Sequence, residues 1–266
     1  QMKVLAGRDK ISMITVPSVV TRYLSMNETK KPFDDIRVRR AVNLAINRKA
    51  LVKVAYNGLA VPSTGYLPPP LEGAVAFDDF EYNPKKAREL LAEAGYPNGF
   101  KTNIWSAYND GKTLKTLLFL QQQLATIGVK AETRALEAGQ RTLIYSAKTP
   151  EDSQHQLYLI GWTNSAAEPD WGLRPLLDSR SMPPVLNNES YYRNPKVDEL
   201  LDKAVAETDP VKRVELYGEI QRIVHADTPW APLVFETMTA GAAKELRNFS
   251  PRPDGSFSFY EAEWRE

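Results

Sequence analysis

The sequence contains no cysteine and only two histidines among its 266 residues. Without cysteine there can be no disulfide bond, no thiolate nucleophile and no cysteine-ligated zinc or iron–sulfur site. The two histidines, His155 and His225, lie seventy positions apart and belong to no metal-binding or catalytic motif. We therefore expect neither a metal site nor a cofactor.

The sequence also lacks an excess of either charge and has no long apolar run. It has 34 Lys and Arg residues against 33 Asp and Glu residues, which leaves a net charge of +1. No block of like charge is present to attract nucleic acid or an anionic membrane. No segment approaches the ~20 apolar residues that a membrane-spanning helix requires. We expect no nucleic-acid partner and no direct membrane span.

Enzyme signatures are missing as well. The sequence has no phosphate-binding GxxxxGK[ST], no GxGxxG, no GxSxG and no HExxH pattern. The adjacent carboxylates Asp34 and Asp35, like those of Asp78 and Asp79, fall at predicted turns or helix starts, where capping explains them better than acid–base catalysis. These absences favour a protein that is not an enzyme.

Helix-start signals are frequent among the nineteen prolines. An Asn or Asp followed by Pro predicts a helix start at Asn83, Asn194 and Asp209, because the side chain caps free amides and Pro fits the first helical position. Two further helices are predicted after Asp35 and from Asn47.

A strand–helix–strand pattern lies in the middle of the chain. Residues 101–106 and 129–136 predict strands, and residues 113–127 predict a helix between them. Further strands are predicted at 156–162 and 230–236. In the helix we expect four leucines to point inward: Leu114, Leu117, Leu118 and Leu124. The pattern predicts an α/β domain.

Polar loops follow the predicted strands, and open α/β sheets bind ligands beyond the carboxyl ends of their strands. Tyr108 and Asn109 follow the first strand of the pair, and Arg141 lies in the loop after the second. Arg141 suits a ligand carboxylate because guanidinium binds carboxylate in a bidentate manner. An ordinary exposed arginine remains the alternative.

The loop after residues 156–162 is the richest candidate wall for a small molecule. Two tryptophans bracket a polar segment, and the candidate ligand-binding residues here are Trp162, Thr163, Asn164, Ser165, Glu168, Asp170 and Trp171. A structural alternative is equally open: Glu168 or Asp170 caps a short helix while both tryptophans belong to the core.

Several of these segments resemble the dipeptide, oligopeptide and nickel family of bacterial extracellular solute-binding proteins. The similar segments are 22–27 (RYLSMN), 31–35 (KPFDD), 37–39 (RVR), 45–48 (AINR), 82–84 (YNP), 87–88 (AR), 90–91 (LL), 94–96 (AGY), 161–162 (GW) and 168–170 (EPD). The resemblance is ordered and covers nearly the whole chain.

This resemblance implies a periplasmic binding protein-like α/β fold of type II, in the peptide-binding cluster. Family members are about twice as long and begin with a signal peptide and a first lobe, whereas this chain begins QMKVL without a signal-peptide pattern. The expected organisation is a remnant of the first lobe with a hinge strand at 1–27, a complete second lobe at 28–229 and a return segment at 230–266. The hinge crossings would lie near Tyr23, Asn27 and Trp230.

A narrower likeness points to members of the family that bind glutathione for an ABC importer. It rests on 16–18 (VPS), 51–55 (LVKVA), 137–141 (EAGQR), 170–171 (DW) and 175–176 (PL). Peptide binders of the family place an aspartate where this chain has Ser165, so the ligand ammonium would face Glu168 or Asp170 instead. The resemblance implies a periplasmic protein that captures glutathione or a similar small peptide and delivers it to permease subunits in the membrane. An absence of cysteine suits a protein that handles a thiol ligand.

Three alternatives remain at this point. The chain could bind a dipeptide, an oligopeptide or a nickel complex, as other members of the family do. It could be a hydrolase that uses Glu168 and Asp170 as a carboxylate pair, although residues two apart diverge on a strand and on a helix. It could also be an interaction module whose loops pack shut.

Overall fold

The fold is built on one six-stranded mixed sheet. The structure, a computed structural model, describes residue 5 and residues 7–265; residues 1–4 of the predicted first-lobe remnant, and residue 6, lie outside the described residues. The strands follow the order β2-β6-β1-β5-β3-β4 across the sheet. Their bounds are β1 Ile11–Met26, β2 Ala60–Pro62, β3 Lys101–Ser106, β4 Lys130–Ala135, β5 Leu157–Thr163 and β6 Trp230–Ala243. β3 pairs in parallel with β4 and with β5, while β1 runs antiparallel to β5 and β6.

The helices begin where capping residues predict. Asn83 accepts a hydrogen bond from the Lys86 amide at 3.0 Å, and Asp35 accepts one from the Arg37 amide at 2.8 Å. The α-helices are α2 Ile36–Leu44, α3 Arg48–Ala55, α4 Pro84–Glu93, α5 Gly111–Ala125, α6 Thr142–Tyr145, α7 Pro169–Leu177, α8 Pro195–Ala206 and α9 Pro210–Asp227. Short 3-10 turns lie at Ala138–Arg141, Pro150–Asp152 and Ser179–Ser181. The three helices with an Asn–Pro or Asp–Pro start are confirmed.

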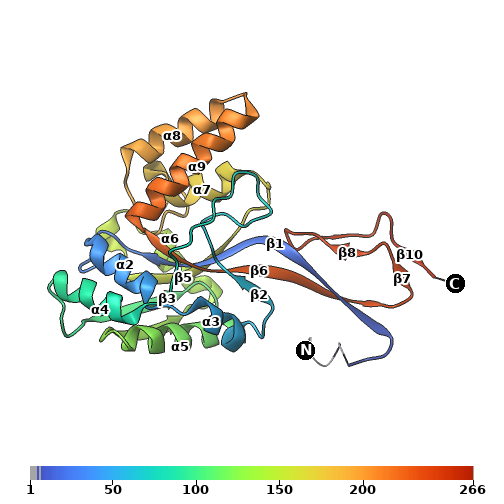
Figure 1. The fold of residues 1–266 in the computed structure, drawn as a ribbon, viewed down its shortest axis with the longest axis horizontal. Helices are drawn as coiled ribbons and strands as arrows, with labels where there is room; N and C mark the ends of the chain where they lie inside the picture. The colour runs from blue at the N-terminus through green and yellow to red at the C-terminus, as the bar shows by residue number, and fades with distance from the viewer. Residues whose placement is uncertain (1–4, 6, 266) are drawn as a thin grey trace.

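Helices cover both faces of the sheet. In Figure 1, α7, α8 and α9 lie on one side, whereas α2, α3, α4 and α5 lie on the other. The prediction for α5 is wrong at two positions, because Leu114 and Leu118 are 44% and 55% exposed. Leu117 and Leu124 are buried as predicted, and the helix also buries Thr113, Thr116, Phe119 and Leu120, so its buried face is turned away from Leu114 and Leu118.

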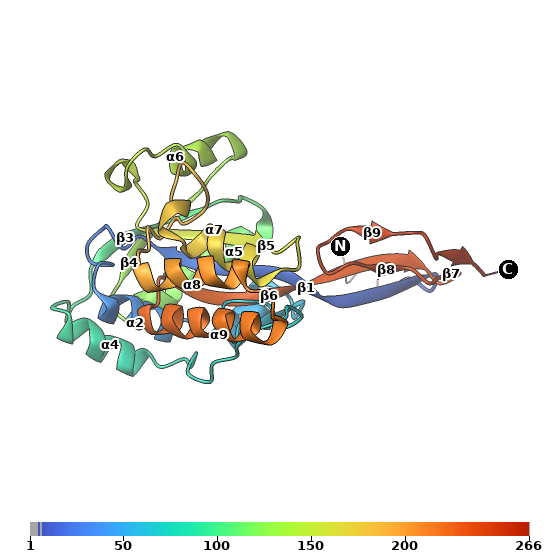
Figure 2. The same cartoon turned by 90° about the horizontal axis from the view of Figure 1, so that it is seen from above.

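β1 and β6 continue beyond the sheet as a long projecting ribbon, seen in Figures 1 and 2. We call the projecting part, residues 11–17 and 237–265, the arm. There β1 pairs with β6 from Ile11 opposite Ala243, while its pairing with β5 begins only at Val20. The arm also carries four short strands: β7 Leu246–Arg247, β8 Ser250–Pro251, β9 Phe257–Ser258 and β10 Glu263–Trp264.

The three residues expected near the hinge crossings lie deep in the lobe. Tyr23 and Trp230 are each 1% exposed, with ring centroids 4.5 Å apart, and Asn27 is fully buried. The register of β1 against β6 shifts between Pro17 and Thr21, where the arm leaves the sheet. The arm therefore leaves the sheet near that shift and not near Asn27 or Trp230.

No helix within residue 5 and residues 7–265 has both the length and the apolar character needed to cross a membrane.

Candidate functional site

The loop after β3 places Tyr108 at the carboxyl edge of the sheet. The Tyr108 amide donates to the Ser106 hydroxyl at 3.2 Å, which turns the chain sharply after the strand. Asp110 then caps α5, accepting from the amides of Lys112 and Thr113 at 3.0 and 3.2 Å. Asn109 between them is exposed. The loop therefore has a defined shape and presents Tyr108 half-buried.

Arg141 comes from the loop after β4 and meets Tyr108. Its guanidinium carbon lies 4.8 Å from the centre of the Tyr108 ring, a cation–π distance. The loop is held by Glu137 and Gln140: the Glu137 amide donates to Gln140 Oε1 at 3.2 Å. Arg141 Nε is buried and has no hydrogen-bond partner among the described residues. Two of the predicted site residues, Tyr108 and Arg141, are therefore in contact, and one donor on Arg141 is unused.

A second guanidinium, from Arg22 on β1, lies on the same tyrosine at 4.9 Å. Arg22 Nε donates to Glu236 Oε1 at 2.8 Å, and Lys112 Nζ lies 2.6 Å from the same oxygen. Burial alone would lower the pKa of Arg22, but the neighbouring Glu236 carboxylate raises it above its ordinary value. Burial alone would raise the pKa of Glu236, and the two cations lower it. Arg22 and Glu236 therefore both stay charged at neutral pH.

Sequence reasoning missed this Arg22–Glu236–Lys112 cluster. A weak signal was available, since Arg22 and Glu236 are charged residues inside apolar strand segments. The side chain of Arg22 passes over Gly161 of β5, where an added Cβ would come within 2.4 Å of its Nη1. Glycine at that position therefore gives Arg22 the room to reach Tyr108.

The two tryptophans of the third loop are brought together. The indole N–H of Trp162, at the end of β5, donates to the Trp171 carbonyl oxygen at 2.7 Å, and the two rings lie 5.4 Å apart. Asn164 is 1% exposed and closes the loop by donating to the Glu168 carbonyl oxygen at 2.8 Å. Trp171 remains 40% exposed. These aromatic rings form a wall of which one part is open to solvent.

The two carboxylates of this loop have different surroundings. Asp170 forms two hydrogen bonds with Arg174, at 2.9 and 3.0 Å, and also accepts from the Tyr217 hydroxyl at 3.2 Å. Glu168 is exposed and caps α7 without a side-chain hydrogen bond to it. Asp170 is thus engaged within the fold, whereas Glu168 is available to a ligand. The two carboxylates share no partner, as a pair acting on one bond would.

Thr163 and Ser165 are both exposed beside this wall. The site therefore offers the half-buried guanidinium of Arg141, one available carboxylate, hydroxyl groups and aromatic surfaces. This set can hold a small molecule that carries both charge signs. Within the described residues, no group of three or more His, Asp or Glu side chains is placed to bind a metal ion.

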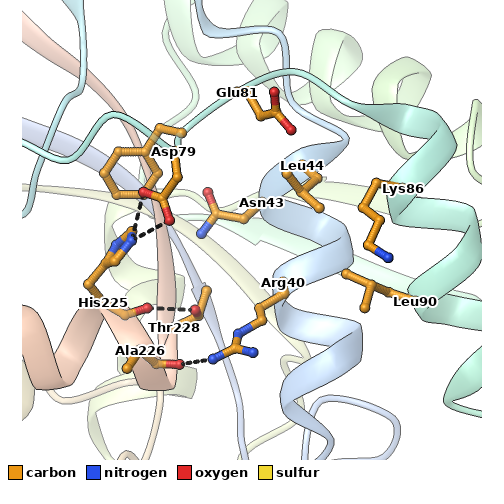
Figure 3. A pocket seen from close by; sticks show the side chains of 11 residues that line it. Arg40, Asn43, Leu44, Asp79, Glu81, Lys86, Leu90, His225, Ala226 and Thr228 are labelled. Atoms are coloured by element: carbon orange, nitrogen blue, oxygen red, sulfur yellow. Dashed lines mark hydrogen bonds and ion pairs between the residues drawn. The ribbon is translucent and has the colours of Figure 1, made fainter.

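A separate pocket of about 460 Å³ lies between α2, α4 and the end of α9. Figure 3 shows its side chains: His225 pairs with Asp79, its Nε2 lying 2.8 Å from Asp79 Oδ1, and Arg40 donates to the Ala226 carbonyl oxygen at 2.8 Å. None of the predicted site residues lines it. It is distinct from the candidate ligand site at the strand ends.

Comparison with known families gives one match over most of the chain. Residues 1–184 match the bacterial extracellular solute-binding proteins, family 5 middle. The glutathione-binding protein GsiB of Escherichia coli strain K12 is 44% identical over 263 residues, which is 99% of this chain and 51% of that protein. GsiB of Salmonella typhimurium has the same identity and coverage. The chain spans about half the length of these curated relatives.

Solved structures agree on the fold. The periplasmic binding protein DppA from Helicobacter pylori, in complex with peptide STSA, is 30% identical with a TM-score of 0.86; all of this chain matches 51% of that one. A dipeptide-binding protein from Pseudoalteromonas in complex with Met-Leu is 26% identical with a TM-score of 0.85, and all of this chain matches 52% of it. The predicted α/β binding-protein fold, with one lobe present, is confirmed.

Proposed function

Because this chain belongs to the bacterial extracellular solute-binding proteins of family 5, we propose that it is the second half of the periplasmic substrate-binding component of an ABC importer. In this proposal it captures a small peptide, with glutathione as the leading ligand, and delivers it to the permease subunits. The supporting likeness is to GsiB, at 44% identity over nearly the whole chain. The name DppA and the bound peptide STSA in the H. pylori structure support a peptide ligand.

The observation that carries the proposal is the convergence of three loops at the carboxyl edge of the sheet. In this arrangement the half-buried Arg141 binds a ligand carboxylate through its guanidinium group. Glu168 receives the ammonium, because Asp170 is already paired with Arg174. Trp171 and Trp162 border the middle of the ligand. Charge-assisted contacts at both ends then fix its orientation.

We propose that the lobe comprises residues from about 20 to 236 and that the arm belongs to a first lobe. This shifts the expected boundaries of 28 and 229 toward the register change in β1. Closure would then bend the ribbon between Pro17 and Thr21, in the manner of hinge motion around a ligand.

The ligand is tested by titrating reduced glutathione, alanyl-alanine and γ-glutamylcysteine into the labelled chain while amide shifts are recorded by NMR, which detects weak binding. We expect glutathione to shift signals around Tyr108, Trp162 and Arg141. An Arg141→Gln variant should bind about tenfold or more weakly, since hydrogen bonds to charged groups contribute about 1.5–3 kcal/mol.

Arg88→Gln is the matched control, because Arg88 lies on α4 and donates to the Thr126 carbonyl oxygen outside the site. Glutathione affinity should be unchanged in it. Shifts with alanyl-alanine alone would replace glutathione by an ordinary dipeptide as the ligand. No shift with any of the three peptides would contradict peptide capture at this edge.

A further inference from the structure

A second pocket, of about 510 Å³, lies where the start of α3, the end of β2 and the segment 77–82 meet. We call residues 77–82 the strap. The pocket is remote from the ligand site, because the two lie at opposite ends of α3. At the C-terminal end of α3, Lys112 at the start of α5 lies 5.4 Å from the centre of the Tyr56 ring. The pocket lies at the N-terminal end. The Asn47 amide there donates to Gln123 Oε1 at 3.0 Å. The volume of the pocket falls within the range of small-molecule sites.

The inner wall of this pocket contains a buried cation without a counter-ion. Arg48 is 4% exposed, and its guanidinium donates to the Pro232 carbonyl oxygen at 2.7 Å and to oxygens of Asn43 and Ile46. No carboxylate within the described residues pairs with it in a salt bridge. Burial lowers the pKa of Arg48 to about 10, so it is cationic at neutral pH. A buried guanidinium surrounded only by neutral oxygens favours an anion nearby.

Two further groups on the same wall point to an anion. Ser63 lines the pocket and is 2% exposed, yet its hydroxyl oxygen has no hydrogen-bond partner. The start of α3 also lines it, and the Asn47 side chain caps only the Ala50 amide, at 3.0 Å. Lys49 adds an exposed cation at the rim. Helix N-termini and cations together attract carboxylate or phosphate.

The strap brings the opposite charge to the other wall. Figure 3 shows Asp79 turned toward His225, so this carboxylate is engaged on the far side of the strap. Asp78 and Glu81 line the second pocket, together with the ring of Phe80, over which the Arg48 guanidinium lies at 4.9 Å. The pocket is therefore cationic toward α3, anionic toward the strap and aromatic between them.

We propose that this pocket binds a zwitterion of amino-acid size, separately from the ligand site at the strand ends. The carboxylate of the ligand lies against Arg48, the Ser63 hydroxyl and the first amides of α3. Its ammonium faces Asp78 and Glu81, and an apolar side chain contacts Phe80. This pocket would be a second binding site, for a ligand smaller than glutathione. The proposal goes beyond the proposed function and does not depend on it.

The test is an NMR titration with L-phenylalanine and with two analogues that each lack one charge, 3-phenylpropionate and phenethylamine. We expect L-phenylalanine to shift amide signals of Arg48, Lys49 and Ser63, with both analogues binding about tenfold more weakly, because each loses a charge-assisted contact. Ser63→Ala and Lys49→Gln should each weaken binding several-fold. Lys53→Gln, one turn along α3 and exposed outside the pocket, is the control and should bind normally.

Equal affinity for L-phenylalanine and 3-phenylpropionate would overturn the zwitterion assignment. Normal binding by Ser63→Ala and Lys49→Gln, or no shift at α3 with L-phenylalanine, would overturn the site itself. Arg141→Gln separates the two sites: it should leave phenylalanine binding unchanged even if glutathione binding is lost, and loss of phenylalanine binding in it would place the signal at the strand ends.

Discussion

The two faces of the central sheet are built from different side chains. The face beneath α2, α3, α4 and α5 is largely aliphatic, with Leu24, Val42, Ile46 and Leu51 fully buried. The face beneath α7, α8 and α9 buries many aromatic rings, among them Tyr23 and Trp230. Two titratable residues at the border of this face, His155 and Glu189, are almost fully buried. The ring centres of His155 and Tyr158 lie 5.4 Å apart, and His155 Nε2 donates a hydrogen bond to the backbone carbonyl oxygen of Glu189.

The two faces of the same strands therefore differ in how their side chains contribute to stability. Aliphatic side chains contribute stability in proportion to the area they bury. Aromatic and polar groups require specific partners, and an unmatched partner costs free energy. Trp162 and Tyr108 of the candidate site pack against the aromatic face. We infer that the aliphatic face anchors the lobe, while the aromatic face shapes the loops that meet a ligand.

The largest expected effect is on the aliphatic face, at Leu24. This residue has no exposed surface, and Leu24→Ala removes three buried carbon atoms and leaves a cavity. The free energy of unfolding should fall by about 2–5 kcal/mol, as for other buried Leu-to-Ala changes. Urea denaturation followed by circular dichroism measures it. A loss below about 1 kcal/mol would show that the sheet can collapse around the missing side chain.

The next effect depends on pH and tests Glu189 on the aromatic side. Burial raises the pKa of Glu189 from its usual 4.5 to about 8. A carboxyl group whose pKa is raised by folding stabilises the protein below its unfolded pKa and loses that contribution as pH rises through its folded pKa. Stability should therefore fall between about pH 4.5 and pH 8 because of this group.

Glu189→Gln removes that titration, so its free energy of unfolding should exceed that of the unchanged chain by up to a few kcal/mol at pH 8 and match it near pH 4.5. Urea denaturation at several pH values measures the difference. Glu219→Gln, on α9, is a control that should show no such trend. Parallel pH profiles for Glu189→Gln and the unchanged chain would mean that Glu189 ionises freely in the folded protein.

A smaller effect is expected where the strands leave the sheet. Glu236→Gln removes the carboxylate that pairs with Arg22 and Lys112, which leaves the partly buried Arg22 without a counter-ion. The free energy of unfolding should fall by about 1–3 kcal/mol. Lys112→Gln keeps the Arg22–Glu236 pair and should cost under about 1 kcal/mol. Thermal unfolding compares the two, and equal losses would show that Lys112 is as important as Arg22 in holding Glu236.

The sequence predicts those parts of the fold that depend on neighbouring residues. Asn83 and Asp110 act through amides two or three positions away, so a helix start can be recognised locally, although the start of α5 at Gly111 precedes the predicted Thr113. The positions of Tyr108 and Arg141, in the loops directly after two predicted strands, can also be recognised from the sequence. The meeting of Arg22 with Glu236 joins positions 214 apart and depends on the register of two antiparallel strands. That register has no local signal that distinguishes it from other arrangements, and neither has the contact of Asp170 with Tyr217, 47 positions away. The Asp170–Arg174 pair, four positions apart on α7, does have one in its helical spacing.

The smallest effect is predicted next to Leu24, on the opposite face, for Tyr23→Phe. The Tyr23 hydroxyl is buried and has no hydrogen-bond partner among the described residues, so its removal takes away an unmatched polar group and leaves the ring in place. The free energy of unfolding should stay within about 1 kcal/mol of the unchanged chain or rise slightly. Tyr192→Phe is the matched control: its hydroxyl donates to Asp227 Oδ2 at 2.5 Å, and losing that bond should cost about 1–3 kcal/mol. Equal losses of stability for the two variants in urea denaturation would contradict this prediction. The Tyr23 hydroxyl would then contribute as much to the stability of the aromatic face as the hydrogen-bonded hydroxyl of Tyr192 does.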